Sequence, residues 1–279
     1  MAMAKLKPGV VYGEDYRALL GACKDGGYAL PAVNVVGSNS VNAVLEAAAR
    51  NQSDIIVQLS NGGAQFFAGQ GMADVDAARV IGAVSAAQHV HLLAQYYGVC
   101  VVLHTDHANR KLLPWIDSLI GEGEKYYKAN GRPLYTSHML DLSEESLEDN
   151  LSICADYLKR MVPLEMSLEI ELGVTGGEED GVGSDLDETD NAKLYPQPDE
   201  VLQAYELLSP IGHFSVAASF GNVHGVYKPG NVHLRPEILK GSQELVATTH
   251  GTRDNPLDLV FHGGSGSEKA KIEEAITYG

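Results

Sequence analysis

Seven short apolar runs alternate along the chain with longer segments of helical periodicity, and this alternation constrains the fold more than any other feature. Runs of strand length that are apolar at nearly every position indicate strands buried on both faces of a parallel sheet. Repeated strand–helix units of this kind predict an α/β fold. We expect the strands at residues 29–36, 55–60, 99–105, 135–140, 166–172, 215–220 and 257–262.

Two arrangements satisfy this pattern, a closed (β/α)8 TIM barrel and an open doubly wound sheet. A doubly wound sheet that binds a dinucleotide has a G-x-G-x-x-G turn after its first strand, and the first apolar run here has none. The number of strand–helix units also favours the barrel. Only seven units are present, and the sequence stops at Gly279, where a seventh helix is ending and an eighth strand would follow. We therefore expect residues 1–279 to form a single barrel domain that is incomplete at its C-terminal end.

The charge and the cysteine content argue against several classes of function. The chain carries 37 acidic residues against 20 Lys and Arg, a net charge of −17, so we expect no broad binding to nucleic acids or anionic membranes. No apolar stretch reaches transmembrane length, and no signal peptide is recognisable. The three cysteines form no C-x-x-C pair, which is typical of reduced, buried cysteines. We expect a cytoplasmic protein.

Histidines and acids gather where the predicted strands end. In parallel α/β proteins the functional site lies at the carboxyl ends of the strands. Three histidines with an open fourth position are the ligand set of a catalytic zinc. Taken singly, each histidine is more often a structural or surface residue, and only their shared position favours a metalloenzyme. The five candidate metal ligands, each at the end of a different apolar run, are His107, Asp141, Glu171, His224 and His262.

Further carboxylates support this interpretation. Asp106 lies beside His107, where a carboxylate can carry a proton or orient a ligand. Glu169 and Glu171 are two residues apart and project from one face of the same strand. Carboxylates buried there are expensive unless they are paired, protonated or bound to metal. None of the predicted strands contains a lysine, so a metal ion is the expected electrophile in place of a Schiff base.

The loop after the last apolar run is rich in small residues. Its sequence, Phe261-His-Gly-Gly-Ser-Gly-Ser267, precedes a helical segment, and exposed N–H groups at a helix N-terminus favour an anion. In (β/α)8 enzymes the loops after strands seven and eight often bind phosphate. Gly263, Gly264 and Ser265 are therefore candidate phosphate-binding residues, and a flexible turn is the alternative.

Other polar features are expected to have structural or solvent-facing roles. Residues 178–190 hold seven acids in thirteen positions, which is typical of a mobile, solvated loop. His89 and His91 are two apart on a helix and point in different directions, so they cannot share one metal ion. The remaining histidines are expected to be core groups on strands, His104 and His138, or loop residues, His213, His233 and His250.

Eight motifs, which follow one another over nearly the whole chain, resemble those of class II, zinc-dependent fructose-1,6-bisphosphate aldolases. Two of them, Leu-Leu-Pro-Trp-Ile-Asp and Gly-Gly-Glu-Glu-Asp-Gly, are similar to the longer, dimeric class IIA branch. The motifs are Leu30-Pro-Ala-Val-Asn34, Gln58-Leu-Ser-Asn-Gly-Gly-Ala64, Leu103-His-Thr-Asp-His107, Lys111-Leu-Leu-Pro-Trp-Ile-Asp117, Glu169-Ile-Glu-Leu-Gly173, Thr175-Gly-Gly-Glu-Glu-Asp-Gly181, Ala218-Ser-Phe-Gly-Asn-Val-His-Gly-Val-Tyr-Lys-Pro-Gly230 and Phe261-His-Gly-Gly-Ser-Gly-Ser267.

The resemblance implies a role for each matching residue. It implies that Asp106 handles the proton on the hydroxyl at the bond being made or broken, and that Glu179 moves the proton at the dihydroxyacetone phosphate carbon. It implies that the zinc ligands are His107, His224 and His262, and that Asp141 and Glu171 hold the metal in an alternative place. It further implies a monovalent cation, Na⁺ or K⁺, near the phosphate loops. The substrate and phosphate residues would be Gly225, Lys228, Gly263, Gly264, Ser265, Asn34 and Ser60.

The activity implied by the resemblance is that of a lyase in glycolysis and gluconeogenesis. It would cleave fructose 1,6-bisphosphate reversibly to dihydroxyacetone phosphate and glyceraldehyde 3-phosphate, and the full-length protein would be a homodimer. The family continues into an eighth strand with an Asn-x-Asp-Thr stretch and a C-terminal arm, which this sequence lacks. The alternatives are an aldolase for tagatose 1,6-bisphosphate or another ketose bisphosphate, a barrel metallohydrolase, and a non-catalytic zinc-binding fragment.

Overall fold

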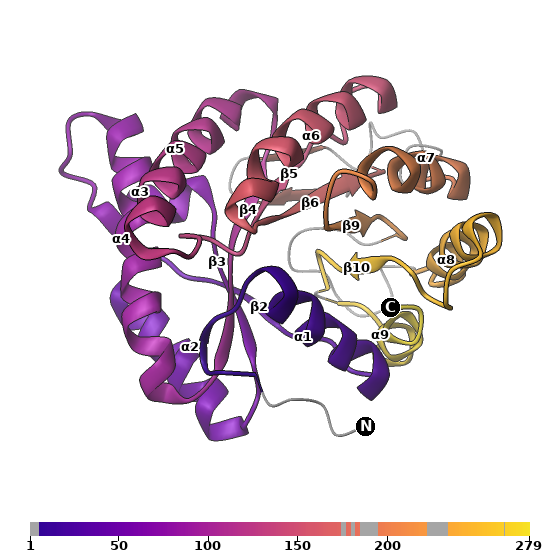
Figure 1. The fold of residues 1–279 in the computed structure, drawn as a ribbon, viewed down its shortest axis with the longest axis horizontal. Coiled ribbons are helices and arrows are strands. Elements are labelled where there is room, and N and C mark those ends of the chain that lie inside the picture. Colours follow the sequence, from indigo (N-terminus) through magenta and orange to yellow (C-terminus); the bar gives the residue numbers. More distant parts are fainter. Residues whose placement is uncertain (1–5, 174–176, 180–181, 185–194, 222–233, 265) are drawn as a thin grey trace. The chain divides into compact units, whose positions relative to one another are not determined.

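Parallel strands alternate with helices along the chain, as the sequence predicted (Figure 1). The computed structural model describes residues 6–173, 177–179, 182–184, 195–221, 234–264 and 266–279. The main sheet has the hydrogen-bonded order β10-β9-β6-β5-β4-β3-β2, which follows the sequence without a reversal. A doubly wound sheet reverses its strand order at a switch point, so this connectivity is that of the (β/α)8 class, with seven βα units in the described residues.

Two compact units make up the chain, and the boundary between them runs through β5 (Ser137–Leu140) and β6 (Ser167–Leu172). The first unit is Met1–Met139 with Arg160–Ser167, and the second is Leu140–Lys159 with Leu168–Gly279. The expectation of a single barrel domain with an incomplete C-terminal end stays a prediction.

The first unit is built around β4 (Cys100–Ala108), which is buried along its whole length. It pairs in parallel with β3 (Ile55–Leu59) and with β1 (Gly9–Val10), and β3 pairs in parallel with β2 (Ala32–Asn34). A strand buried on both faces cannot leave polar backbone groups unpaired, and parallel partners on both sides of β4 meet that requirement. The helices are α1 (Gly13–Gly26), α2 (Ser38–Asn51), α3 (Asn61–Ala68), α4 (Val75–Tyr97) and α5 (Leu113–Asn130), with a 3-10 turn at Arg110–Leu112.

Local signals in the sequence account for the helix boundaries. The side chain of Asp74 accepts the N–H of Ala77 at the start of α4, which satisfies one of the free donors of the first turn. Gly98 ends the same helix with a φ of 73°, a left-handed conformation that glycine adopts without strain. The chain therefore leaves α4 at Gly98 and enters β4 two residues later.

The second unit contains β6, β9 (Phe214–Ala218) and β10 (Asp258–Val260), all parallel. Its helices are α7 (Pro198–Leu208), α8 (Glu237–His250) and α9 (Lys269–Ile276), and α6 (Leu147–Met161) lies mostly within it before a 3-10 turn at Val162–Leu164. The β6 and β9 strands pair from Leu168 opposite Phe214 to Leu172 opposite Ala218. Their carboxyl ends therefore lie level.

Three features differ from the sequence prediction. The acidic segment, predicted to be a solvated loop, contains the antiparallel strands β7 (Gly177–Glu179) and β8 (Val182–Ser184). The two-residue strand β1 was not predicted, because it is too short to show a period. β4 continues to Ala108, three residues beyond its predicted end, so Asp106 and His107 lie within the strand.

In the described part of the chain, none of the helices combines the length and apolarity that crossing a membrane requires.

Candidate metal centre

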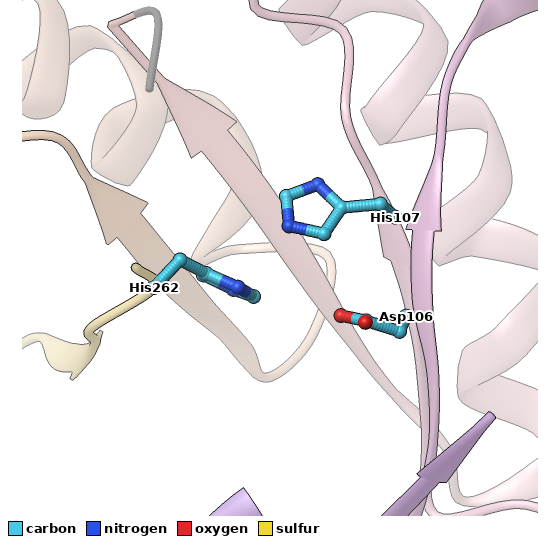
Figure 2. A group of neighbouring side chains, drawn as sticks. All are labelled: Asp106, His107 and His262. Atoms are coloured by element: carbon cyan, nitrogen blue, oxygen red, sulfur yellow. The ribbon is translucent and has the colours of Figure 1, made fainter. Parts of the chain in front are cut away.

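Asp106 and His107 project from the carboxyl end of β4 in the first unit (Figure 2). Both are buried, Asp106 with only 1% of its surface exposed, and they offer ligand atoms within 4.8 Å of each other. The backbone of His107 has a φ of 20°, a value that residues other than glycine seldom adopt. Such conformations persist where a site requires a particular side-chain direction.

The two carboxylate oxygens of Asp106 differ in their hydrogen bonding. Asn34, the last residue of β2, donates from Nδ2 to Asp106 Oδ2 at 2.8 Å. Asp106 Oδ1 is buried and has no hydrogen-bond partner among the described residues. A buried acceptor without a partner costs about 1–3 kcal/mol, and more when it is charged. The arrangement therefore fits a carboxylate that receives a proton or faces a cation.

Ser60 occupies the same edge of the first unit's sheet, directly after β3. It is the N-cap residue of α3, and its Oγ accepts the N–H of Gly63 at 3.1 Å. The strand register places Asn34 opposite Gln58 and Gln58 opposite His104. Asn34, Ser60 and Asp106 therefore lie at neighbouring strand ends, and the assignment of Asn34 and Ser60 to the substrate side stays a prediction.

Asp141 and Glu171 are brought together in the second unit. Asp141 follows β5, Glu171 lies near the end of β6, and their ligand atoms are within 4.8 Å of each other. Ser143 donates from Oγ to Asp141 Oδ1 at 2.7 Å. Asn150, on α6, donates from Nδ2 to the backbone oxygen of Glu171 at 3.0 Å and ties the strand end to the helix. Two acidic oxygens this close form a pair that a cation would stabilise.

His262, also labelled in Figure 2, follows β10 by two residues and is held by Glu169 of β6. The Nε2 atom of His262 lies 2.9 Å from Glu169 Oε1. Gly263, the next residue, has a φ of 67°, so a glycine is required where the loop turns toward α9. Ser267 donates its N–H to the backbone oxygen of Gly264 and closes this turn.

Several residues singled out in the sequence lie outside the described residues. These are His224, Gly225, Lys228, His233 and Ser265. Of Glu179, only the backbone, in β7, is described. Their assignments stay predictions.

The other strand and helix histidines have the structural contacts that the sequence suggested. His89 Nε2 lies 2.8 Å from Asn42 Oδ1, and His91 Nε2 lies 3.0 Å from the backbone oxygen of Leu134. Burial lowers the pKa of His91 to about 4. Burial, and secondarily the neighbouring His104, lowers the pKa of His138 to about 3. The rings of His91 and His138 are therefore neutral at physiological pH, and the contacts of these histidines do not require a metal.

Two contacts were not foreseen from the sequence. One is the bond from Asn34 to Asp106, and the other is the pairing of Glu169 with His262. The only sequence signal for the contact of Glu169 with His262 was the spacing of Glu169 and Glu171. This spacing indicated that a buried carboxylate needed a partner but did not identify the partner. His250 was expected in a loop and is instead the last residue of α8.

Connectivity of the (β/α)8 class, with buried histidines and carboxylates at the strand ends, defines a class of metal-dependent barrel enzymes. The model of one protein family, Fructose-bisphosphate aldolase class-II, matches residues 14–279. The chain belongs to this family, and the resemblance drawn from its motifs is confirmed.

Curated relatives and solved structures agree with this assignment. The chain is 56% identical over 276 residues to a "Fructose-bisphosphate aldolase" of Edwardsiella ictaluri, covering 98% of this chain and 76% of that protein. It is 55% identical over 277 residues to a "Fructose-bisphosphate aldolase class 2" of Escherichia coli K12, covering 98% and 77%. A crystal structure of fructose-bisphosphate aldolase from Campylobacter jejuni superposes with a TM-score of 0.87 at 55% identity, covering 98% and 76% of the two chains.

Proposed function

We propose that this chain is a metal-dependent aldolase that cleaves fructose 1,6-bisphosphate reversibly to dihydroxyacetone phosphate and glyceraldehyde 3-phosphate. The observation that carries the proposal is the buried pair at the end of β4. There a potential metal ligand, His107, stands beside a carboxylate, Asp106, one oxygen of which has no partner in the described part of the chain. Membership of the aldolase family supports the reaction, and the names of the relatives support the substrate.

The proposed zinc ligands are the three strand-end histidines, and Asp141 and Glu171 would hold the metal in a second position. Imidazole and carboxylate donors suit zinc, and each unit contributes a pair of ligand atoms within 4.8 Å. When bound, zinc supplies Lewis acidity to the ketone oxygen on which negative charge develops. The three histidines are His107, His224 and His262.

Two carboxylates would transfer the protons of the reaction. Asp106 would take the proton of the substrate hydroxyl through Oδ1, while Asn34 holds Oδ2 and keeps the carboxylate directed. As that hydroxyl becomes a carbonyl, the electrons of the carbon–carbon bond pass to the carbon beside the ketone. Glu179 would protonate that carbon, and in the reverse direction each carboxylate would exchange the same proton in the opposite sense.

Phosphate binding would depend on local donors, because the net charge of −17 repels an anionic substrate over longer distances. Gly263, which has a left-handed φ, and Gly264 precede α9 in sequence, and backbone N–H groups and the dipole at a helix N-terminus favour an anion. Ser60 and Asn34 would lie on the substrate side. The remaining proposed phosphate residues are Gly225, Lys228 and Ser265, with a monovalent cation, Na⁺ or K⁺, nearby.

The test is cleavage of fructose 1,6-bisphosphate before and after chelation, with zinc then restored. We expect activity to disappear with the chelator and to return with zinc. Cleavage that survives complete metal removal would refute the metal-dependent mechanism. Faster turnover of tagatose 1,6-bisphosphate than of the fructose epimer would transfer the assignment to another ketose bisphosphate, and stoichiometric zinc without turnover of either would indicate a non-catalytic fragment. Light scattering would test the proposed homodimer.

A further inference from the structure

We propose that Glu169 is a positioning residue of the metal centre, and that its carboxylate fixes the tautomer and orientation of His262 so that Nδ1 faces the metal. The inference rests on the proposed function, because it takes His262 as a metal ligand. It deepens that proposal by assigning a task to a carboxylate that neither binds the substrate nor carries its protons.

The geometry is that of a buried ionic hydrogen bond. Glu169 Oε1 and His262 Nε2 are 2.9 Å apart, and the two side chains are only 8% and 10% exposed. The residues are 93 positions apart in sequence and come from β6 and from the segment just after β10. A carboxylate held on a rigid strand orients the ring better than a neighbour on the same loop would.

The sheet leaves room for this contact. In the strand order, β9 lies between β6 and β10, so the Glu169 side chain must pass over β9 to reach His262. The residue directly opposite Glu169 on β9 is Ser215, and the residue opposite Glu171 is Ala217. Both are small and buried. A larger side chain at position 215 would occupy the path of the carboxylate.

The chemistry of the pair decides which ring nitrogen serves the metal. An ionised carboxylate only accepts hydrogen bonds, so Nε2 of His262 must carry the proton. The neutral ring then has its lone pair on Nδ1, the form that binds zinc. Metal-binding histidines commonly donate their second N–H to a carboxylate, and loss of that partner typically weakens metal affinity by about 10–100-fold.

The same unit contains a matched control pair. His213 Nε2 lies 2.7 Å from Asp258 Oδ2, and the two side chains are 13% and 19% exposed. His213 directly precedes β9 and Asp258 begins β10, so this pair lies at the amino ends of the strands. Asp258→Asn therefore makes the same chemical change in a similar buried pair, at the end of the sheet that holds no proposed ligand.

The experiment measures the zinc dissociation constant by competition with a chromophoric chelator, on chains of residues 1–279 whose folding is verified by circular dichroism. We expect Glu169→Gln to weaken zinc binding by about 10–100-fold, Glu169→Asp to weaken it less because the charge is retained, and Asp258→Asn to leave it within about twofold. The visible spectrum of the cobalt-loaded protein should change with Glu169→Gln and stay unchanged with Asp258→Asn.

Two results would overturn the inference, and they have different meanings. If folded Glu169→Gln and Glu169→Asp bind zinc as tightly as the wild type, Glu169 has no positioning role, although the metal site stands. If His262→Ala leaves zinc affinity unchanged, His262 is not a ligand, and the ligand set under the proposed function fails together with the inference. If Glu169→Gln does not fold, Glu169→Asp and the cobalt spectrum decide the question.

Discussion

The close packing of α3 against α4 leads to a stability prediction of definite sign. A Cβ atom added at Gly82, on α4, would lie 1.8 Å from the backbone oxygen of Ala64 and 3.1 Å from the backbone nitrogen of Ala68, both on α3. Carbon–oxygen contacts between packed elements are about 3.3–3.6 Å, so Gly82→Ala would force the two helices about 1.5 Å apart. The obstructing atoms belong to the backbone and cannot rotate away.

The expected loss can be estimated from two opposing terms. Overpacking lowers the free energy of unfolding by about 1–3 kcal/mol when side chains can adjust. Because backbone atoms obstruct the added Cβ in Gly82→Ala, we expect its overpacking cost to be about 3 kcal/mol or more. Alanine recovers about 1 kcal/mol through its higher helix propensity. The net expectation is a loss of about 2 kcal/mol or more in the free energy of unfolding, which corresponds to about 4–8 °C in melting temperature for a chain of this size.

A matched control isolates the packing term. Gly121 lies within α5, and a Cβ added there meets nothing within 4 Å. Gly121→Ala should therefore stabilise the chain by about 0.5–1 kcal/mol through helix propensity alone. Urea unfolding of both variants measures the difference. If Gly82→Ala proved as stable as Gly121→Ala, the close approach of α3 to α4 would be refuted.

Displacement of α3 in Gly82→Ala should also move Ser60, a proposed substrate-side residue, because Ser60 caps this helix. We expect Gly82→Ala to raise KM for the bisphosphate more than it lowers kcat, since Ser60 is proposed to contact substrate and not to carry protons. A change in kcat alone would argue against this connection.

Three further predictions follow from the site and the core. Asp106→Asn should lower kcat by about 10²–10⁴-fold, the usual contribution of a general base, with zinc content unchanged by metal analysis; loss of zinc as well would mean that Asp106 holds the metal. Ser60→Ala should cost about 1 kcal/mol in urea unfolding, because it removes the acceptor for the Gly63 N–H. Burial lowers the pKa of His91 to about 4 and that of His138 to about 3, whereas both protonate near 6.5 in the unfolded chain. Their contribution to stability is therefore complete above about pH 6.5 and declines as the pH falls from there toward 3, by about 3–5 kcal/mol for each histidine. For His91, the check is the difference in the free energy of unfolding between the wild type and His91→Gln. If this difference did not change between pH 7 and pH 5, the prediction would be contradicted.

The strands were predictable because most of each strand lies in a continuous apolar run. All seven predicted strands form, and their order follows the sequence. The prediction ended β4 too early because Asp106 and His107 are polar and resemble the start of a loop. Both nevertheless lie within β4, where Asp106 accepts a hydrogen bond from Asn34 of β2. Polar residues at a functional strand end thus hide the boundary that apolar patterning shows elsewhere.

The short strands were not predictable, for a different reason. β7 and β8 lie in a strongly acidic segment, and neither of these paired three-residue strands shows apolar alternation in its sequence. The two residues of β1 gain their strand character only from their neighbour β4, which lies about ninety residues away in sequence. Local propensity carries no information about such partners.

The strand ends at which the candidate residues lie were predictable, but the pairing between these residues was not. The carboxyl-end rule placed His107, Asp141, Glu171 and His262 at the correct strand ends, because in a parallel sheet that edge is common to every strand. Which carboxylate supports which histidine depends on register and on the size of the side chains between them. The match of Glu169 with the small residue Ser215 is invisible until the register of β6 and β9 is known.

The same register explains how one strand can supply carboxylates for two different tasks. Glu169 and Glu171 share a face of β6, but Glu169 lies two residues further from the strand end and faces Ser215, while Glu171 faces Ala217. Glu169 reaches His262, and Glu171 lies beside Asp141. Each carboxylate is buried, and burial of an unpaired charge costs several kcal/mol. Glu169 faces a ring nitrogen of His262, whereas Glu171 faces a second carboxylate, an arrangement that a cation would stabilise, so the two carboxylates of one strand suit different tasks.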